Sequence, residues 1–452
     1  MEFPIYEAPY LGNGMTIALD AVLHVLISHG LAIGAITLIV LSEYLGFRKS
    51  SKDWENFAKN FLKFTIIVIT GIGAVTGVGI WFITSAIAPN GIGSMLRIFF
   101  WPWFIEWIIF TLEVIVLLIY YFTWDKWKGE RKIQHIYLGI SYIVLSVSSA
   151  FLITGILGFM LTSDGWPWDK SFLSAFFNPS FLPQLFLRAA LSFALGALFS
   201  LAFLLITHNV NVFRKEALRL FGKVFFISFF AISLFTWWYF AIVPSAFKTH
   251  AVILIPGFSQ HPEILYAINA LGIIIMLLIA FFAFKRSVTF SKIFIVPGLI
   301  FFIGFVTEFE RVREFIRGPY LIPGYMYANQ ILLDESLFVE EYSILQNDYW
   351  YNEITDKPDI TNQGAFLFGR NCSACHTIGG INSIQDAVKG RSEDGIFVIL
   401  GHTHEMVPFM PPFSGTEQER QLMSRFLFQL ANGNITLKAP SRFAPIKEDE
   451  GK

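Results

Sequence analysis

The sequence predicts an all-α fold: a polytopic bundle of about eight transmembrane helices with its N-terminus outside, followed by a small helical domain, also outside. Two observations support this prediction. The 452 residues are 54% hydrophobic and only 15% charged, with a mean hydropathy of +0.57, and this is the composition of a polytopic membrane protein. After the apolar part, the chain holds an acidic stretch and then a Cys-x-x-Cys-His motif at 372–376.

Eight stretches are long and apolar enough to cross a bilayer, which takes about 20 residues. They lie near residues 16–42, 61–88, 98–123, 135–161, 181–206, 222–247, 263–284 and 293–315. The eighth is marginal because charged residues crowd its outer end, among them Glu310 and Arg311. Close helix packing is expected along the second stretch, where glycines recur from Gly71 to Gly79.

Basic residues are concentrated in every second connection between these stretches. The first, third, fifth and seventh connections hold fifteen Lys or Arg, whereas the second, fourth and sixth hold three. By the positive-inside rule the odd connections are cytoplasmic, so the N-terminus and the region after the eighth span lie outside. The net charge of −1 gives nucleic acid binding no electrostatic basis.

Cys372, Cys375 and His376 form the attachment pattern of a c-type haem. Two thiols add to the two vinyl groups of one porphyrin, and the adjacent imidazole then becomes an axial ligand of the iron. The chain has no other cysteine, so a redox dithiol and half of a zinc site are weaker alternatives. Because haem c is attached outside the cytoplasm, the motif agrees with the orientation that the loop charges predict.

Met410 is the expected opposite axial ligand, since a thioether followed by two prolines is held on a stiff loop. His402 and His404 are its competitors. We expect four regions: a haem-binding transmembrane domain (1–317), an acidic linker (318–361), a cytochrome c domain (362–437) and a polar, disordered tail (438–452). The linker is either a solvated connection or a docking face for a basic partner protein.

Ionisable side chains inside the predicted spans are costly in hydrocarbon and are therefore functional candidates. Those toward the outer face are His24, His29, Glu106, Glu113, Arg188, Glu308 and Arg313. Imidazole or carboxylate suits haem iron and arginine suits haem propionates, so the cluster predicts a buried haem site. The alternatives are that one of the two histidines is a packing residue and that Glu106 pairs with Arg188.

These residues give the chain a resemblance to subunit I of the cytochrome bd quinol oxidases, collinear over roughly residues 16–325. The matching segments are Ala18–His24, Glu43, Ile105-Glu106, Leu112-Glu113, Trp124-Asp125, Thr307-Glu308-Phe309 and Arg317–Tyr320. The resemblance implies that His24 is an axial ligand in the di-haem oxygen site and that Glu308 ligates the high-spin b haem. The family spaces its two glutamates one residue further apart, so Glu113 matches more closely than Glu106.

The chain also departs from the family at two ligand positions. The low-spin b haem of the family uses a His and a Met where this sequence has Arg188 and Asn269. Arginine is no ordinary iron ligand and asparagine is a poor one. The long quinol-binding loop is missing as well, because fewer than twenty residues join the sixth and seventh spans.

The resemblance and the charge pattern together imply a respiratory electron-transfer haemoprotein, an oxidoreductase of the prokaryotic inner membrane with its cytochrome c domain on the periplasmic face. One covalent haem c would exchange electrons with one or two non-covalent haems of b or d type. A small oxidant, oxygen or nitric oxide, would be reduced there, with Glu106 and Glu113 supplying protons.

Two alternatives remain open at this stage. In the first, quinol is oxidised and electrons leave outward through the c haem. In the second, the chain is the haem-bearing membrane subunit of a larger respiratory complex. The implied partners are a second membrane subunit and a soluble cytochrome or other redox protein outside.

Overall fold

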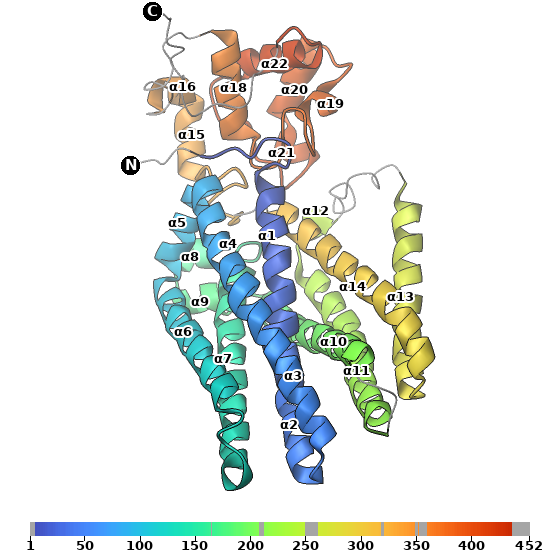
Figure 1. Cartoon of the computed structure of the whole chain (residues 1–452). Helices are drawn as coiled ribbons and strands as arrows, with labels where there is room; N and C mark the ends of the chain where they lie inside the picture. The colour runs from blue at the N-terminus through green and yellow to red at the C-terminus, as the bar shows by residue number, and fades with distance from the viewer. Residues whose placement is uncertain are drawn as a thin grey trace, which may run out of the picture.

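The computed structural model describes residues 5–163, 165–207, 212–248, 261–317, 321–348, 351 and 359–435. Eight of its helical segments are long and apolar enough to cross a membrane, which confirms the predicted number. These segments are Asn13–Lys49, Lys52–Ile87, Phe100–Thr123, Gly129–Phe159, Phe172–Thr207, Val212–Ile242, Pro262–Phe284 and Val288–Arg313. They form an elongated bundle (Figure 1).

The first two spans are each interrupted by a π-helical segment. The first consists of α1 (Asn13–Ile27), η1 (Ser28–Ala35) and α2 (Ile36–Lys49), and the second of α3 (Lys52–Val68), η2 (Ile69–Gly73) and α4 (Ala74–Ile87). A π-helical turn inserts one residue into a helix and often marks a functional site. The expected close packing is found at three of these glycines: an added Cβ would lie 2.8 Å from Ile27 at Gly73, 3.2 Å from the His24 ring at Gly77 and 3.1 Å from Asp20 at Gly79. It is not found at Gly71, where an added Cβ would have no neighbour within 4 Å.

The remaining spans are mostly single helices. They are α6 (Phe100–Thr123), α7 (Lys132–Phe159), α10 (Phe181–Thr207), α11 (Val212–Ile242), α13 (Pro262–Phe284) and α14 (Val288–Arg317). Short segments complete the membrane part: α5 (Pro89–Ile98), η3 (Gly129–Arg131), α8 (Trp166–Asp169), α9 (Phe172–Phe176) and α12 (Ser245–Lys248).

Helix α10 packs directly against η1 and α11. The approach to η1 is so close that a Cβ on Gly34 would lie 1.9 Å from the Ser192 carbonyl oxygen. Small residues allow membrane helices this contact. It brings the part of the first span that follows His24 against the helix that carries Arg188.

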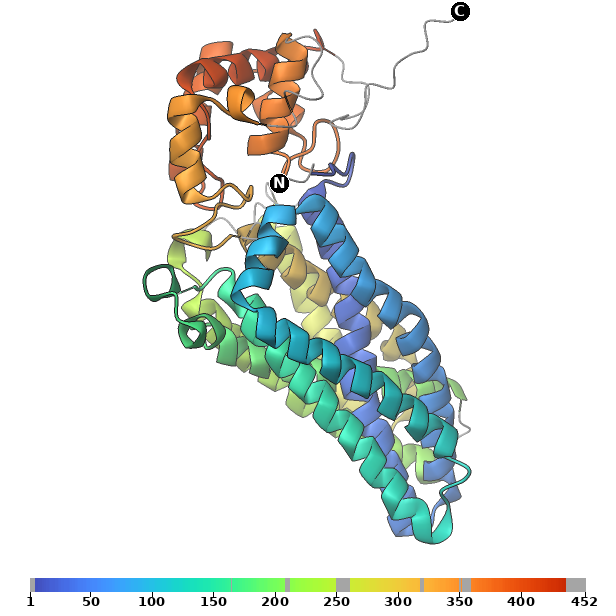
Figure 2. The ribbon, with the colours of Figure 1, turned by 90° about the vertical axis from the view of Figure 1, so that its left-hand side faces the viewer.

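The C-terminal domain is a compact set of helices beyond the N-terminal end of α1 (Figures 1 and 2). Its helices are α15 (Leu333–Tyr342), α16 (Ile344–Asn347), α18 (Ile360–Asn371), α19 (Ile384–Val388), α20 (Glu393–Gly401), α21 (Thr403–Met406) and α22 (Glu417–Ala431). Its core includes Leu367 and Phe426, from α18 and α22, together with Val339 and Leu345, from α15 and α16. Helices of the expected acidic linker therefore share a core with the expected cytochrome c domain.

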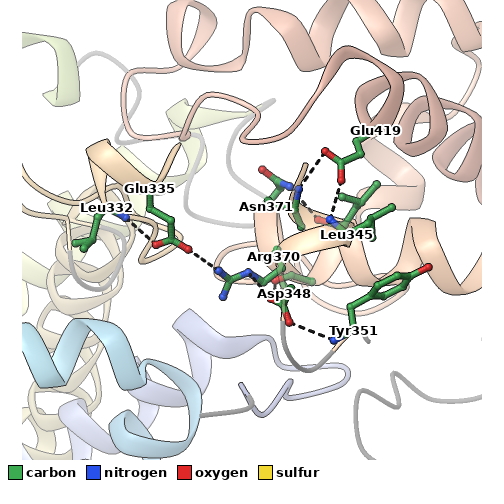
Figure 3. A network of polar contacts seen from close by, with 12 residues as sticks. Leu332, Glu335, Leu345, Asp348, Tyr351, Arg370, Asn371 and Glu419 are labelled. Carbon is green, nitrogen blue, oxygen red and sulfur yellow. Dashed lines mark hydrogen bonds and ion pairs between the residues drawn. The ribbon is translucent and has the colours of Figure 1, made fainter. Parts of the chain in front are cut away.

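A network of polar contacts ties the acidic stretch to the helices around the motif (Figure 3). Arg370 lies just before the motif and pairs with Glu335 at 2.8 Å and with Asp348 at 3.5 Å. Glu419 on α22 accepts a hydrogen bond from the backbone N–H of Leu345 at 2.8 Å. Two carboxylates of the acidic stretch thus hold an arginine of the C-terminal domain.

Candidate functional site

The Cys-x-x-Cys-His motif forms a tight turn at the end of α18. The N–H groups of Cys375 and His376 both donate to the carbonyl of Cys372, at 3.1 and 2.9 Å. Cys372 and Cys375 form no disulfide and are half-buried. Surrounding protein raises the pKa of each thiol to about 12, with Cys375 contributing to the shift at Cys372. The two free sulfurs lie on one turn, as attachment to a single porphyrin requires.

His376 presents its ring in a form that suits an iron ligand. Its Nδ1 lies 3.2 Å from the carbonyl oxygen of Asn382. Because a carbonyl can only accept, Nδ1 carries the proton and Nε2 keeps its lone pair. Burial lowers the pKa of His376, which keeps the ring neutral. A metal-binding histidine is typically oriented in this way, so the residues present fit a covalently attached haem.

Met410 lies on the loop that follows α21. Its backbone carbonyl accepts a hydrogen bond from Nδ1 of His404 at 2.8 Å, and the next carbonyl, of Pro411, accepts from the Thr403 hydroxyl at 2.6 Å. Nδ1 of His402 lies 3.0 Å from Oε2 of Glu405, within hydrogen-bond distance. The two competing histidines are thus both engaged in local contacts, one of which supports the Met410 loop.

The motif loop contacts the start of the first membrane span. The Gly14 N–H donates to the carbonyl of Ala374, inside the motif, at 3.2 Å, and the Ile381 N–H donates to Tyr10 O at 2.7 Å. Cys375 packs against a cluster of buried residues that includes Tyr239 of α11 and Phe409 of the C-terminal domain. The motif therefore lies on the membrane bundle, at the end where α1 begins.

His24 lies ten residues into the span from Gly14. Its Nδ1 is 3.2 Å from the hydroxyl of Thr76 on α4. The same hydroxyl donates to the carbonyls of Ile72 and Gly73, at 2.9 and 3.0 Å. Since its proton is used there, the Thr76 oxygen accepts from Nδ1–H of His24. His24 thereby keeps a lone pair on Nε2, as His376 does.

His29 has a different environment, although it lies only five residues further along. Its Nε2 is 3.3 Å from Nη1 of Arg188, which can only donate, so the lone pair of Nε2 is used. Both side chains are buried. Arg313 also interacts electrostatically with His29, and it is ion-paired with Glu310 one turn earlier on α14. The structure thus brings His29, Arg188 and Arg313 together, one span turn beyond His24.

Glu308 lies on α14, which packs against α1. Its Oε1 accepts a hydrogen bond from the side chain of Asn269 on α13 at 3.2 Å. The two positions at which the sequence departs from the family thus contact two other predicted site residues: Arg188 contacts His29, and Asn269 contacts Glu308.

Glu106 and Glu113 face one neighbouring helix, α7, as their spacing predicts. Glu106 accepts from the hydroxyl of Ser149 at 3.0 Å, and Glu113 accepts from Ser146 at 2.5 Å. The alternative partner considered for Glu106, Arg188, is the donor to His29 instead. The seam between α6 and α7 is therefore polar within the membrane part.

A buried polar cluster at the other end of this seam was not anticipated. Glu43 of α2 contacts Tyr120 of α6 and both Lys132 and His135 of α7. In the sequence, Lys132 is one of the fifteen basic residues of the odd connections, and His135 was not predicted to be a functional residue. Lys132 and His135 are three residues apart at the start of an apolar helix, so they share one face of it. Further polar residues follow along the same helix at Tyr142, Ser146 and Ser149. This spacing is the sequence signal that indicates a polar face.

Most of the chain is similar to known proteins. Residues 14–246, just over half of the chain, match the family model of cytochrome bd terminal oxidase subunit I. The chain also resembles the solved structure of bd oxidase from Geobacillus thermodenitrificans, with a TM-score of 0.57 and 20% sequence identity, over 70% of this chain and 90% of that one. No curated protein matches it. The chain therefore belongs to the subunit I family of the cytochrome bd terminal oxidases, which are haem-containing membrane proteins of respiratory chains.

Proposed function

We propose that the chain is the haem-bearing subunit of a respiratory oxidoreductase in which a c-type haem at the outer end exchanges electrons with a haem buried in the bundle. The c haem would be held by Cys372, Cys375, His376 and Met410, and would supply one-electron transfer. The buried haems, of b or d type, would be held through His24 and Glu308, with one of these two ligands on each iron. A small oxidant such as oxygen would be reduced there.

The observation that supports this proposal best is the backbone hydrogen bond between Ala374 and Gly14. It joins the haem-attachment turn to the helix that carries His24. Ten residues of α-helix separate Gly14 from His24, which is about 15 Å at 1.5 Å per residue. The two iron-binding candidates are thus linked through one short, rigid element.

The available nitrogen atoms support the same assignment of roles. His24 and His376 both keep a lone pair on Nε2, whereas the Nε2 of His29 accepts from Arg188. We therefore assign His24 as the iron ligand and His29 as a residue that positions Arg188. Arg188 and Arg313 would bind propionates, which are the anionic groups at the edge of a haem.

Glu106 and Glu113 would hold and transfer protons for the reduction, because each carboxylate faces a hydroxyl donor within the bundle. The C-terminal domain would lie on the periplasmic side of a prokaryotic inner membrane, where a soluble cytochrome or other redox protein could reach it. A second membrane subunit would complete the complex.

Family membership favours a second candidate function, in which quinol is the electron donor and the c haem passes electrons outward. The two candidates make different use of the buried haem. Reduction of a small oxidant needs an open iron coordination position, whereas a pure electron conduit has two protein ligands on each iron.

The deciding experiment is the reduced-minus-oxidised absorption spectrum of the purified complex, repeated with carbon monoxide. We expect a c-haem signal together with a buried haem whose spectrum shifts on binding carbon monoxide. A c haem and a six-coordinate b haem without any shift would show that the protein only conducts electrons. Absence of a covalent c haem would contradict the role of the motif.

A further inference from the structure

We propose that Glu43 and His135 form a buried proton-holding site at the cytoplasmic end of the α6–α7 seam, and that this site supplies protons to Glu113. The inference rests on the proposed function, which consumes protons, and deepens it by naming the place where they enter. The site consists of Glu43 (α2), Tyr120 (α6), Lys132 and His135 (α7).

The hydrogen bonds of His135 leave the position of exactly one proton open. Its Nε2 lies 2.8 Å from the backbone carbonyl of Tyr120, which can only accept, so Nε2 carries a proton. Its Nδ1 lies 2.6 Å from Oε1 of Glu43. The proton between these two atoms can be bonded to either of them, with every other contact unchanged.

The other two partners of Glu43 are compatible with both positions of that proton. The Tyr120 hydroxyl donates to Oε2 at 2.6 Å, and Nζ of Lys132 lies 2.5 Å from Oε1. In one form a carboxylate faces an imidazolium. In the other, the N–H bond is broken and an O–H bond is formed, so that a carboxylic acid faces a neutral imidazole. The transfer moves one proton and cancels one pair of opposite charges.

The cluster is fully enclosed, which distinguishes it from the surface ion pairs at this end of the bundle. Glu43, Tyr120 and His135 are each 0% exposed and Lys132 is 5% exposed. The Tyr120 and His135 rings stack, with centroids 4.5 Å apart, and Nζ of Lys132 lies 4.5 Å from the centroid of Trp124. Burying three ionisable groups is costly unless they are paired, so a proton added or removed here changes the local energy strongly.

The position of the cluster fits a point of entry. Glu43 lies six residues before Lys49, which ends the first span. The loop charges predict that this end of the span faces the cytoplasm. Exposed charges surround this end, including the pair of Lys59 with Asp125 at 2.7 Å. Protons thus have to cross only about 9 Å, the rise of six helical residues, between the cytoplasmic water and the carboxylate of Glu43.

The seam above the cluster continues in the same register. On α7, Tyr142, Ser146 and Ser149 follow His135 at seven, eleven and fourteen residues, and on α6, Glu113 and Glu106 precede Tyr120 at seven and fourteen. Multiples of seven bring side chains back to the same helix face. Seven residues rise about 10 Å, a step that two or three water molecules or a rotating side chain can bridge.

The test compares Glu43→Gln with Glu216→Gln in the complete complex reconstituted in vesicles. Glu216 is the matched control, because it is also a carboxylate paired with a lysine at this end of the bundle, but it is exposed on α11. Proton uptake from the cytoplasmic side is followed with a pH-sensitive dye after rapid mixing with oxidant. Infrared difference spectra in H2O and D2O report the protonation of the carboxyl group independently of turnover.

We expect Glu43→Gln to slow proton uptake at least tenfold and to remove one carboxyl band, with haem spectra unchanged, while Glu216→Gln behaves as wild type. Wild-type uptake and an unaltered infrared spectrum in Glu43→Gln would overturn the proposal and identify a structural ion pair. If Glu43→Gln does not assemble, His135→Gln removes the same proton carrier. Failure of both to assemble, with an intact Glu216→Gln, also identifies a structural pair.

The outcomes separate this inference from the proposed function. If the wild-type complex takes up no protons when it meets oxidant, oxidant reduction is refuted, and the infrared band of Glu43 still tests the proton-holding site. If the wild type and Glu43→Gln take up protons equally fast, only the inference fails.

Discussion

Two histidines 352 positions apart in the chain are oriented by the same device. His24 and His376 each donate from Nδ1 to a fixed oxygen, a threonine hydroxyl in one case and a backbone carbonyl in the other. In each histidine, the hydrogen bond from Nδ1 fixes the orientation of the ring and makes Nε2 a better ligand for iron. The oxygen that orients His376 is six positions away in the chain, whereas the oxygen that orients His24 comes from another span.

At this scale we predict that His376→Ala keeps the covalent haem, because both thioether sulfurs remain, but removes an axial ligand. The midpoint potential of the c haem should shift by on the order of 100 mV, since axial ligands set haem potentials over a wide range. Potentiometric titration followed in the c-haem absorption band measures this shift. His402→Ala, at an exposed histidine of the same domain, should leave the potential unchanged. If the potential shifted only in His402→Ala, then His402 and not His376 would be the axial ligand.

A second residue-scale prediction concerns Glu308→Ala. The change removes a carboxylate from the membrane bundle and leaves Asn269 without this partner. The spectrum of a buried haem should change while the c-haem band stays as in wild type. Glu263→Ala, an exposed carboxylate on the helix that carries Asn269, is the control. A buried-haem spectrum identical to wild type in Glu308→Ala would remove this residue from the site.

The residues of the haem motif could be named from the sequence because its chemistry fixes their spacing. The partners of the buried residues could not. The hydrogen-bond partners of His24 and Glu43 come from other spans, Thr76 52 positions away and His135 92 positions away. Lys132 is an example. In the sequence it stands beside the charges of a loop, and nothing there indicates that its side chain pairs with the buried Glu43.

At the scale of elements, the contact between the motif loop and residues 8–14 is held by backbone atoms. An added Cβ at Gly380 would lie 2.2 Å from the carbonyl oxygen of Tyr10, and a backbone atom cannot rotate away. At the adjacent Gly379, a Cβ would meet only the end of the Gln385 side chain, at 3.1 Å. The two glycines therefore form a matched pair.

We predict that Gly380→Ala separates this contact at a cost of about 1–3 kcal/mol, the usual range for overpacking. Amide hydrogen exchange at Ile381, whose N–H donates to Tyr10, should then become about 10- to 100-fold faster. Gly379→Ala should exchange as wild type does. Equal protection of Ile381 in both variants would show that the contact does not hold the loop in place.

The π-helical segments belong to this scale and were not predicted. Their sequences, Ser28–Ala35 and Ile69–Gly73, are as apolar as the α-helix around them, so hydrophobic periodicity gives no signal. Their positions are informative only in the structure, where one contains His29 and the other ends three residues before Thr76, the partner of His24.

At the scale of the whole molecule, the eight spans could be predicted because each is an uninterrupted apolar stretch between charged connections. The folding of the acidic stretch could not be predicted from its charges. Its carboxylates pair with Arg370, 35 positions after Glu335, and its apolar residues join a core that extends to Leu430.

The orientation of the molecule leads to a labelling prediction. We expect Lys52→Cys, in the first connection, to react with a membrane-impermeant maleimide only in inside-out vesicles. Trp168→Cys, which replaces a side chain that is 87% exposed in the fourth connection, should react in intact cells. The native cysteines do not interfere once they are bound to haem. The reverse pattern would invert the topology and place the motif in the cytoplasm.

The packing of Cys375 against the membrane bundle has a consequence for biogenesis. Its side chain shares a cluster with residues of α11 and α14, while the N-terminal segment is hydrogen-bonded to the adjacent loop. An enzyme that attaches haem must reach both sulfurs, and the assembled molecule covers one of them. We therefore expect the C-terminal domain to be translocated and loaded with haem first, and to settle on the membrane part afterwards.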